Sequence, residues 1–122
     1  MREILFRGKE DGCFYCGNLI TTVSKEKLIA VIQEHDTLLH TKHLVDVKTV
    51  GQYTGLTDKN GAKIFEGDVL NFRGDIGYVV FSGGSFSAIN DDSTVNIRPH
   101  EFSFCEVNGN IHDNNIGVTL NF

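Results

Sequence analysis

Residues 50–87, VGQYTGLTDKNGAKIFEGDVLNFRGDIGYVVFSGGSFS, indicate a series of short β-strands that are separated by tight turns. The pairs Asn60-Gly61 and Gly83-Gly84 tolerate positive φ, so the chain can reverse at each of them at little cost. Between these turns, residues 76–82 are rich in β-branched and aromatic side chains and form the clearest predicted strand. Further strands are expected at residues 62–66, 69–72 and 85–90.

The connections between these strands are short, and one of them contains a glycine between two apolar runs. Gly67-Asp68 interrupts the alternation there, which favours a bulge or a sharp bend. Alternation in the last strand places Phe86 and Ala88 on one face and Ile89 on the other. Short strands with strong bends close more easily into a small barrel than into a flat sheet. We therefore expect a mostly β protein whose second half forms a small β-barrel.

The same segment resembles the hallmark motif of the YopX family of phage and prophage proteins. The resemblance is carried by residues 50–61 and 64–69, and residues 1–8, 11–20 and 107–111 also resemble family segments. Cys13, Phe14 and Cys16 depart from the family pattern, as does the tail after His112. The resemblance implies a mostly β protein with an SH3-like barrel in the C-terminal half. It implies no activity, because the function of the family is uncharacterised.

The first part of the chain indicates further strands. They are expected at residues 3–7, 14–22 and 38–47. Asp11-Gly12 predicts a hairpin turn, Gly17 a bulge, and residues 34–37 another turn. Residues 25–33 fit either a helix or a strand face, and their β-branched content and short length favour a strand.

No Pro-, Ser- or Gly-rich linker precedes Val50. We therefore expect the N-terminal β-hairpin region, residues 1–49, to pack on the barrel region, residues 50–122, as one compact unit. This is the domain organisation that the sequence predicts.

The C-terminal segment predicts short strands and turns. Residues 94–97 fit a short strand, and Pro99 then ends it because proline has no N–H to donate. Phe102 and Phe104 alternate with polar neighbours, which predicts a strand with both rings on one face. Residues 108–110 predict a turn, and residues 116–122 a last strand or a loose tail.

The composition of the chain argues against several classes of function. The chain has 122 residues with a net charge of −5 and a pI near 5.4, which argues against sequence-independent nucleic-acid binding. No segment approaches the roughly 18 apolar residues that span a bilayer, and no apolar signal core follows the N-terminus. We therefore expect a cytoplasmic protein with no membrane attachment. Its three cysteines, an odd number, indicate free thiols rather than a disulfide framework.

Two groups of residues have side chains of the types that bind a metal ion or act as a nucleophile. Cys13 and Cys16, with downstream histidines, have spacing close to that of a zinc site. The histidines are His35, His40 and His43. A strand would put the two cysteines on opposite faces, so we prefer to interpret them as small apolar residues and expect no metal or other cofactor.

Cys105 is the only local candidate for a nucleophile, with His100 or His112 as base. A strand cysteine beside Phe104 is more simply a buried packing residue, so we expect no enzyme activity. The carboxylate pairs Glu66/Asp68 and Asp91/Asp92 lack the further ligands of a hydrolase. Glu66 and Asp68 lie at a bend and are expected to accept backbone N–H groups, whereas the second pair is a solvated loop.

Gln52, Tyr53 and Thr54 are the candidate binding residues. They lie between Gly51 and Gly55, which indicates tightly placed backbone and fixed side-chain directions. Internal hydrogen bonding that knits the two halves together is the favoured interpretation, because buried polar groups must be paired. An exposed recognition surface built around Tyr53 is the alternative.

These observations favour a phage accessory protein that acts by binding, with copies of itself or a host or phage protein as partner. The edge strands that small open barrels leave unpaired support this. The alternative is a nucleic-acid-binding barrel, which the acidic balance disfavours. Its stacking residues would be Tyr15, Tyr53, Phe72 or Tyr78. A metal- or thiol-dependent enzyme is the third possibility.

Overall fold

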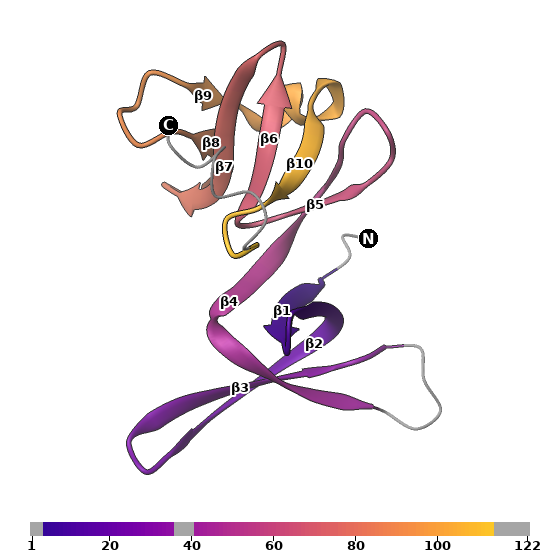
Figure 1. Cartoon of the computed structure of the whole chain (residues 1–122), viewed down its shortest axis with the longest axis vertical. Coiled ribbons are helices and arrows are strands. Elements are labelled where there is room, and N and C mark those ends of the chain that lie inside the picture. Colours follow the sequence, from indigo (N-terminus) through magenta and orange to yellow (C-terminus); the bar gives the residue numbers. More distant parts are fainter. Residues whose placement is uncertain (1–3, 36–40, 114–122) are drawn as a thin grey trace. The chain divides into compact units, whose positions relative to one another are not determined.

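A computed structural model describes residues 4–35 and 41–113 of the chain (Figure 1). Within these residues the protein is mostly β, with ten strands and one short 3₁₀ helix. The chain divides into two compact units, Met1–Tyr53 and Thr54–Phe122, which we call unit 1 and unit 2. That the two halves pack together as one body stays a prediction. No helix in the described part of the chain has the length and apolarity needed to cross a membrane.

Unit 1 is built from four antiparallel strands whose pairings form a cycle. The strands are β1 (Phe6–Glu10), β2 (Cys13–Ser24), β3 (Lys27–Gln33) and β4 (Lys42–Thr57). Each strand pairs with the next, and β1 also pairs with β4. The predicted Asp11-Gly12 hairpin is confirmed, with φ of 51° and 84° at the two residues. The first strand begins at Phe6, so the predicted strand at residues 3–7 does not include Ile4 and Leu5, and residue 3 lies outside the described residues.

Gly17 has a different role from the predicted bulge. The register from β1 to β2 continues to Gly17 without a shift, and β2 then changes partner to β3 at Asn18. A Cβ atom on Gly17 would lie 2.0 Å from the carbonyl oxygen of Gln33. Glycine is therefore required here by the close approach of another backbone.

The predicted strand at residues 25–33 is confirmed as β3, which follows a turn at Lys25-Glu26. Its alternate residues Ala30 and Ile32 are buried and pack with Val45 of β4 in the core of unit 1. The predicted return strand is the beginning of β4, which then continues without interruption into unit 2. The predicted turn at residues 34–37 and the start of the return strand fall partly outside the described residues.

Unit 2 contains the meander that the turn signals predicted. Its strands are β5 (Lys63–Phe65), β6 (Asp68–Phe72), β7 (Asp75–Ser82), β8 (Ser85–Ile89), β9 (Asn96–Ile97) and β10 (Glu106–Asn110). The sheet order is β10-β6-β7-β8-β9. Gly83 and Gly84 have φ of 62° and 82° and form the tight β7–β8 turn. The predicted faces of β8 are confirmed, because Phe86 and Ala88 are buried.

The segment after β9 corrects two predictions. Pro99–Phe104 is a 3₁₀ helix, which places Phe102 and Phe104 on different sides, with 0% and 64% of their surface exposed. Proline starts this helix readily because the first N–H groups of a helix have no partner within it. The predicted turn at residues 108–110 instead lies within β10, where the register shifts between Val107 and Gly109.

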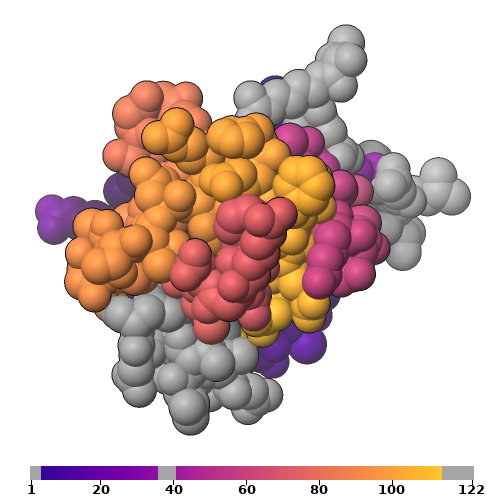
Figure 2. Space-filling view, turned by 90° about the horizontal axis from the view of Figure 1, so that it is seen from above, coloured from indigo at the N-terminus to yellow at the C-terminus, as the bar shows by residue number. Residues whose placement is uncertain are grey.

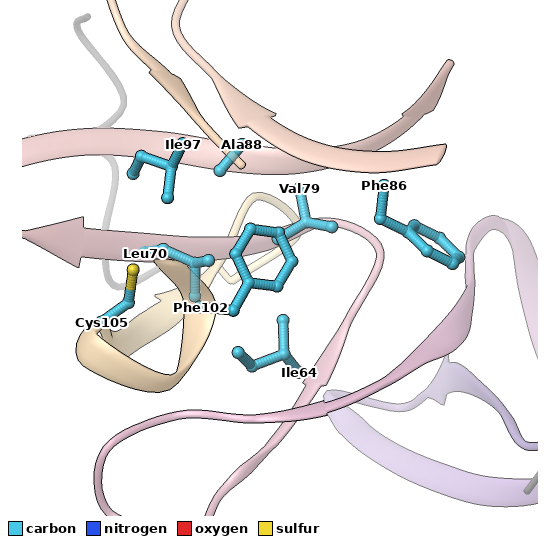
Figure 3. Packing of buried hydrophobic residues seen from close by; sticks show 8 residues of the cluster. All are labelled: Ile64, Leu70, Val79, Phe86, Ala88, Ile97, Phe102 and Cys105. Carbon is cyan, nitrogen blue, oxygen red and sulfur yellow. The ribbon is translucent and has the colours of Figure 1, made fainter. Parts of the chain in front are cut away.

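The core of unit 2 is a cluster of apolar side chains from both the sheet and the 3₁₀ helix (Figure 3). Phe102 is fully buried, and in Figure 3 its ring lies among Ile64, Leu70 and Val79. Cys105 is buried in the same cluster. The 3₁₀ helix therefore contributes the largest fully buried side chain to this core.

We predict that Phe102→Ala lowers the free energy of unfolding of unit 2 by about 3 to 5 kcal/mol, because it removes a fully buried ring and leaves a cavity. Phe104→Ala is the matched control, and we expect a change within about 0.5 kcal/mol for this exposed ring. Urea unfolding followed by circular dichroism measures both. Equal losses in the two variants would contradict the 3₁₀ assignment.

Candidate functional site

The predicted binding residues lie in β4 at the junction between unit 1 and unit 2. Tyr53 and Thr54 are buried, and Gln52 is half-buried. The Tyr53 N–H donates to the carbonyl of Leu5, at 2.7 Å. The Thr54 hydroxyl donates to the carbonyl of Ile64, at 2.8 Å, and accepts the N–H of Leu56, at 3.1 Å. Thr54 thus ties the end of β4 to β5, and a binding role for the three residues stays a prediction.

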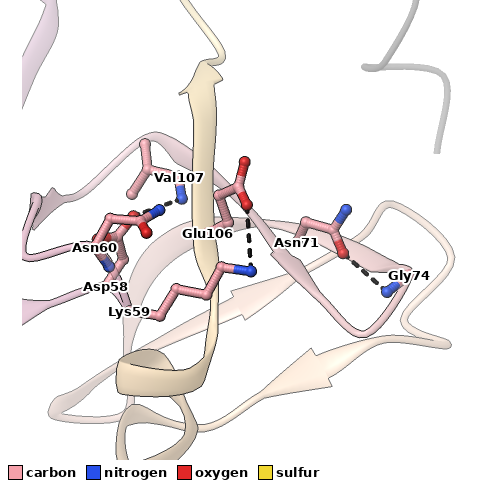
Figure 4. A network of polar contacts seen from close by, with 7 residues as sticks. All are labelled: Asp58, Lys59, Asn60, Asn71, Gly74, Glu106 and Val107. Atoms are coloured by element: carbon pink, nitrogen blue, oxygen red, sulfur yellow. Dashed lines mark hydrogen bonds and ion pairs between the residues drawn. The ribbon is translucent and has the colours of Figure 1, made fainter.

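The buried carboxylate of Asp58 organises the loop between β4 and β5 (Figure 4). One oxygen accepts the N–H groups of Asn60, at 2.8 Å, and Ala62, at 2.9 Å. The other accepts the N–H of Val107 in β10, at 3.0 Å. Burial alone would raise the pKa of Asp58, but the three N–H donors and the neighbouring Lys59 charge together lower it. The carboxylate therefore holds the loop against β10 in its ionised form.

The contact between this loop and β10 is extended by Lys59. Its N–H donates to the carbonyl of Cys105, at 3.0 Å, and its ammonium lies 3.3 Å from the Glu106 carboxylate. Figure 2 shows this face of unit 2, where the yellow C-terminal strand lies beside the magenta segment that precedes β5.

The predicted role of the Glu66/Asp68 bend is confirmed for Asp68, which is buried at the start of β6. One of its oxygens accepts the N–H of Phe65, at 2.8 Å. The other accepts the side-chain amide of Asn110, at 3.1 Å. The amide oxygen of Asn110 in turn accepts the N–H of His112, at 2.9 Å. Asp68 at this bend is therefore joined to the end of β10.

In the described part of the chain, the cysteine pair does not come together with His35 or His43 as a metal site. Cys13 and Cys16 are exposed on β2. His43 stacks on Tyr15, with ring centroids 3.6 Å apart, and its two nitrogens face Glu10 and Glu34 at 3.4 and 3.1 Å.

His35 contacts the side-chain oxygen of Asn18 at 2.8 Å, and His40 lies outside the described residues. Among the described residues, no three His, Cys, Asp or Glu side chains form a group that could hold a metal ion.

Cys105 occupies the position that packing predicts. Its thiol is buried and contacts the carbonyl of Glu101 at 3.3 Å. Burial, with smaller contributions from Glu101 and Asp58, raises the pKa of Cys105 to about 11. The thiolate that nucleophilic catalysis needs is therefore scarce at neutral pH.

The aromatic residues considered for base stacking have partners within the described chain. Tyr15 stacks on His43, and Tyr53 is buried. The guanidinium of Arg73 lies 5.1 Å from the ring centre of Phe72. Tyr78 donates its hydroxyl to Asp91, and this hydrogen bond raises the pKa of Tyr78.

Unit 1 carries an exposed apolar surface that sequence reasoning missed. Val23 of β2 and Leu28 of β3 face each other across the hairpin, with 69% and 55% of their surface exposed. On the opposite face, the exposed Ile20 and Leu44 flank the half-buried Val31 in a row across β2, β3 and β4. We call these five residues the hairpin surface. The only signal in the sequence was the absence of charge from Asn18 to Ser24.

The fold and these contacts define a small antiparallel β protein with buried carboxylates that bind backbone N–H groups. The family model described as YopX protein matches residues 5–116, so the chain belongs to the YopX family. The resemblance seen in the sequence is thereby confirmed. A search of curated proteins finds no match.

We predict that Asp58→Asn lowers the free energy of unfolding by about 1 to 3 kcal/mol at neutral pH, because it weakens hydrogen bonds to a charged acceptor. The pKa of Asp58 is lowered in the folded state, so its contribution is present above the ordinary value of 3.8 and is lost as pH falls through the folded value. The variant should therefore lose less stability than the original chain between about pH 5 and pH 2.

Urea unfolding at several pH values measures this difference. Asp75→Asn, at an exposed carboxylate, is the control and should keep the original pH dependence. An unchanged acid dependence in Asp58→Asn would contradict the role assigned to this carboxylate.

We predict that a thiol-specific alkylating reagent at pH 7 modifies Cys13 and Cys16 in the native protein and leaves Cys105 unmodified. The first two thiols are exposed, whereas the third is buried and protonated. Intact mass spectrometry should therefore show two additions in buffer and three in urea. Rapid modification of Cys105 in the folded chain would contradict this prediction and support the hypothesis of a thiol-dependent enzyme.

Proposed function

We propose that this YopX family chain is a non-catalytic accessory protein of a phage or prophage that works in the bacterial cytoplasm by binding, with copies of itself as the partner. The observation that carries the proposal is the hairpin surface of unit 1. Apolar side chains at this level of exposure, on both faces of one ribbon, are typical of a surface that another molecule covers.

The distribution of charge supports self-association through unit 1. Unit 1 holds seven basic and seven acidic residues, for a net charge of zero, whereas unit 2 holds four basic and nine acidic residues. The net charge of −5 therefore belongs to unit 2. Copies of an acidic chain repel one another, so contact through the neutral unit costs the least.

In this proposal unit 2 is an SH3-like barrel that serves as scaffold. Two features support the assignment: β6, β7, β8 and β9 form a meander, and the 3₁₀ helix Pro99–Phe104 leads into β10, which returns to β6. The buried thiol of Cys105 and the structural use of Asp58 and Asp68 support a role without catalysis.

We predict that the purified chain forms dimers or larger assemblies at micromolar concentration. Size-exclusion chromatography with light scattering, over a range of concentrations, measures this. Replacing Val23 and Leu28 by lysine should raise the dissociation constant by about tenfold or more, because truncating a central contact commonly costs about 2 kcal/mol. Phe104→Lys, at an exposed ring of unit 2, is the matched control and should leave the assembly intact. A chain that stays monomeric at every concentration would contradict the proposed self-association.

A further inference from the structure

The hairpin surface lies next to an unpaired strand edge. From Asn18 to Ser24, β2 pairs with β3 on one side. β1 pairs with β2 only up to Gly17, and no other strand in the described residues pairs with the remaining part of β2. Figure 1 shows this part of the hairpin extending as a two-stranded ribbon beyond the rest of unit 1. One edge of β2 is therefore open over the seven residues that pair with β3.

This edge lacks the sequence features that prevent the sheet edges of two molecules from pairing. Natural edge strands usually carry charged residues, proline or a bulge. The segment NLITTVS, residues 18–24, contains no charged residue and no proline, and its register with β3 runs without a shift. An isolated two-stranded ribbon is also only marginally stable in water. Both considerations favour a further strand at this edge.

The open segment can pair with a second copy of itself. The two segments match in length, place the same face of the sheet on the same side, and bring no charges together. Its ends are set by β1 at Gly17 and by the turn at Lys25-Glu26. A two-fold axis through Thr21 would pair the segment antiparallel with its own copy and keep the same face of the sheet on the same side in both chains. Leu19 would then lie opposite Val23 of the second copy. Because no charges meet in this register, the pairing has no electrostatic penalty.

We propose that the β2 edge, residues 18–24, is an isologous interface in which two copies pair antiparallel about Thr21 and form one continuous sheet. This rests on the proposed self-association and adds the edge and the register. The new pair brings Leu19 and Val23 together across the interface. It thereby covers part of the apolar surface that each hairpin leaves exposed on its own.

Cross-linking tests the register. In a chain with Cys13→Ser and Cys16→Ser, we would introduce Thr21→Cys and oxidise the protein. Opposed Cα atoms in antiparallel strands lie about 4.5 to 5.5 Å apart, within the range that a disulfide bridges. Most of the protein should therefore run as a covalent dimer on a non-reducing gel. Thr22→Cys in the same background is the matched control, because its symmetry mate lies diagonally across the axis, beyond about 7 Å.

A charge exchange provides a second test that needs no oxidation. Thr21→Lys sets like charges opposite each other at the axis and should weaken self-association by about tenfold or more. Mixing Thr21→Lys with Thr21→Glu should restore association, and Thr21→Ser should leave it unchanged. Restored association also excludes misfolding as the cause of the loss.

The outcomes separate the two proposals. Assemblies that form in light scattering, but neither cross-link at Thr21 nor respond to Thr21→Lys, would overturn the β2 interface and leave self-association standing. Equal cross-linking at residues 21 and 22 would overturn the register. A chain that is monomeric throughout would overturn both.

Discussion

Two buried carboxylates connect the segments near the start of unit 2 to β10. Asp58 and Asp68 each accept a backbone N–H near the start of unit 2 and a donor from β10 or its end, more than 40 residues away. A carboxylate taken out of water is costly unless its oxygens are hydrogen-bonded. Each of these carboxylates meets that requirement with local and distant donors together. The loops they fix therefore link the region around β5 to β10, the last strand among the described residues.

This arrangement explains why the most recognisable stretch of the sequence has no obvious chemistry. The polar residues in residues 50–69 serve the backbone: Thr54 links β4 to β5, Asp58 shapes the loop and Asp68 fixes the bend before β6. A motif can be specific to a family because its hydrogen bonds define the fold. The surface proposed for association lies elsewhere, on β2 and β3 of unit 1.

Local chemistry predicted much of the fold. The turns at Asp11-Gly12 and Gly83-Gly84 followed from residues that tolerate positive φ, and the strand β3 followed from its β-branched content. The 3₁₀ helix at Pro99–Phe104 was missed because Phe102 and Phe104 alternate as they would in a strand. Alternation gives the period of a segment, but it does not reveal that the core accommodates only one of the two rings.

The candidate site was harder to predict for a similar reason. A sequence shows which residues are apolar, but not which of them the rest of the chain leaves uncovered. Val23 and Ile32 are equivalent in pattern, yet one is exposed and the other is fully buried because β4 pairs with only part of β3. The role of Gly17 was also hidden, because the carbonyl that approaches it belongs to Gln33.

The continuity of β4 has a consequence for how members of this family can diverge. Beyond the register shift between Asp46 and Gly51, β4 pairs Gln52 with Phe6 of β1 in unit 1 and buries Thr54 in unit 2, with no loop between Gln52 and Thr54 to absorb a change in length. Inserting or deleting one residue between these positions would turn the side chains of one unit to the wrong face. Length variation should therefore accumulate in the connecting loops or at the register shift between Asp46 and Gly51, while the distance from Gln52 to Thr54 stays fixed.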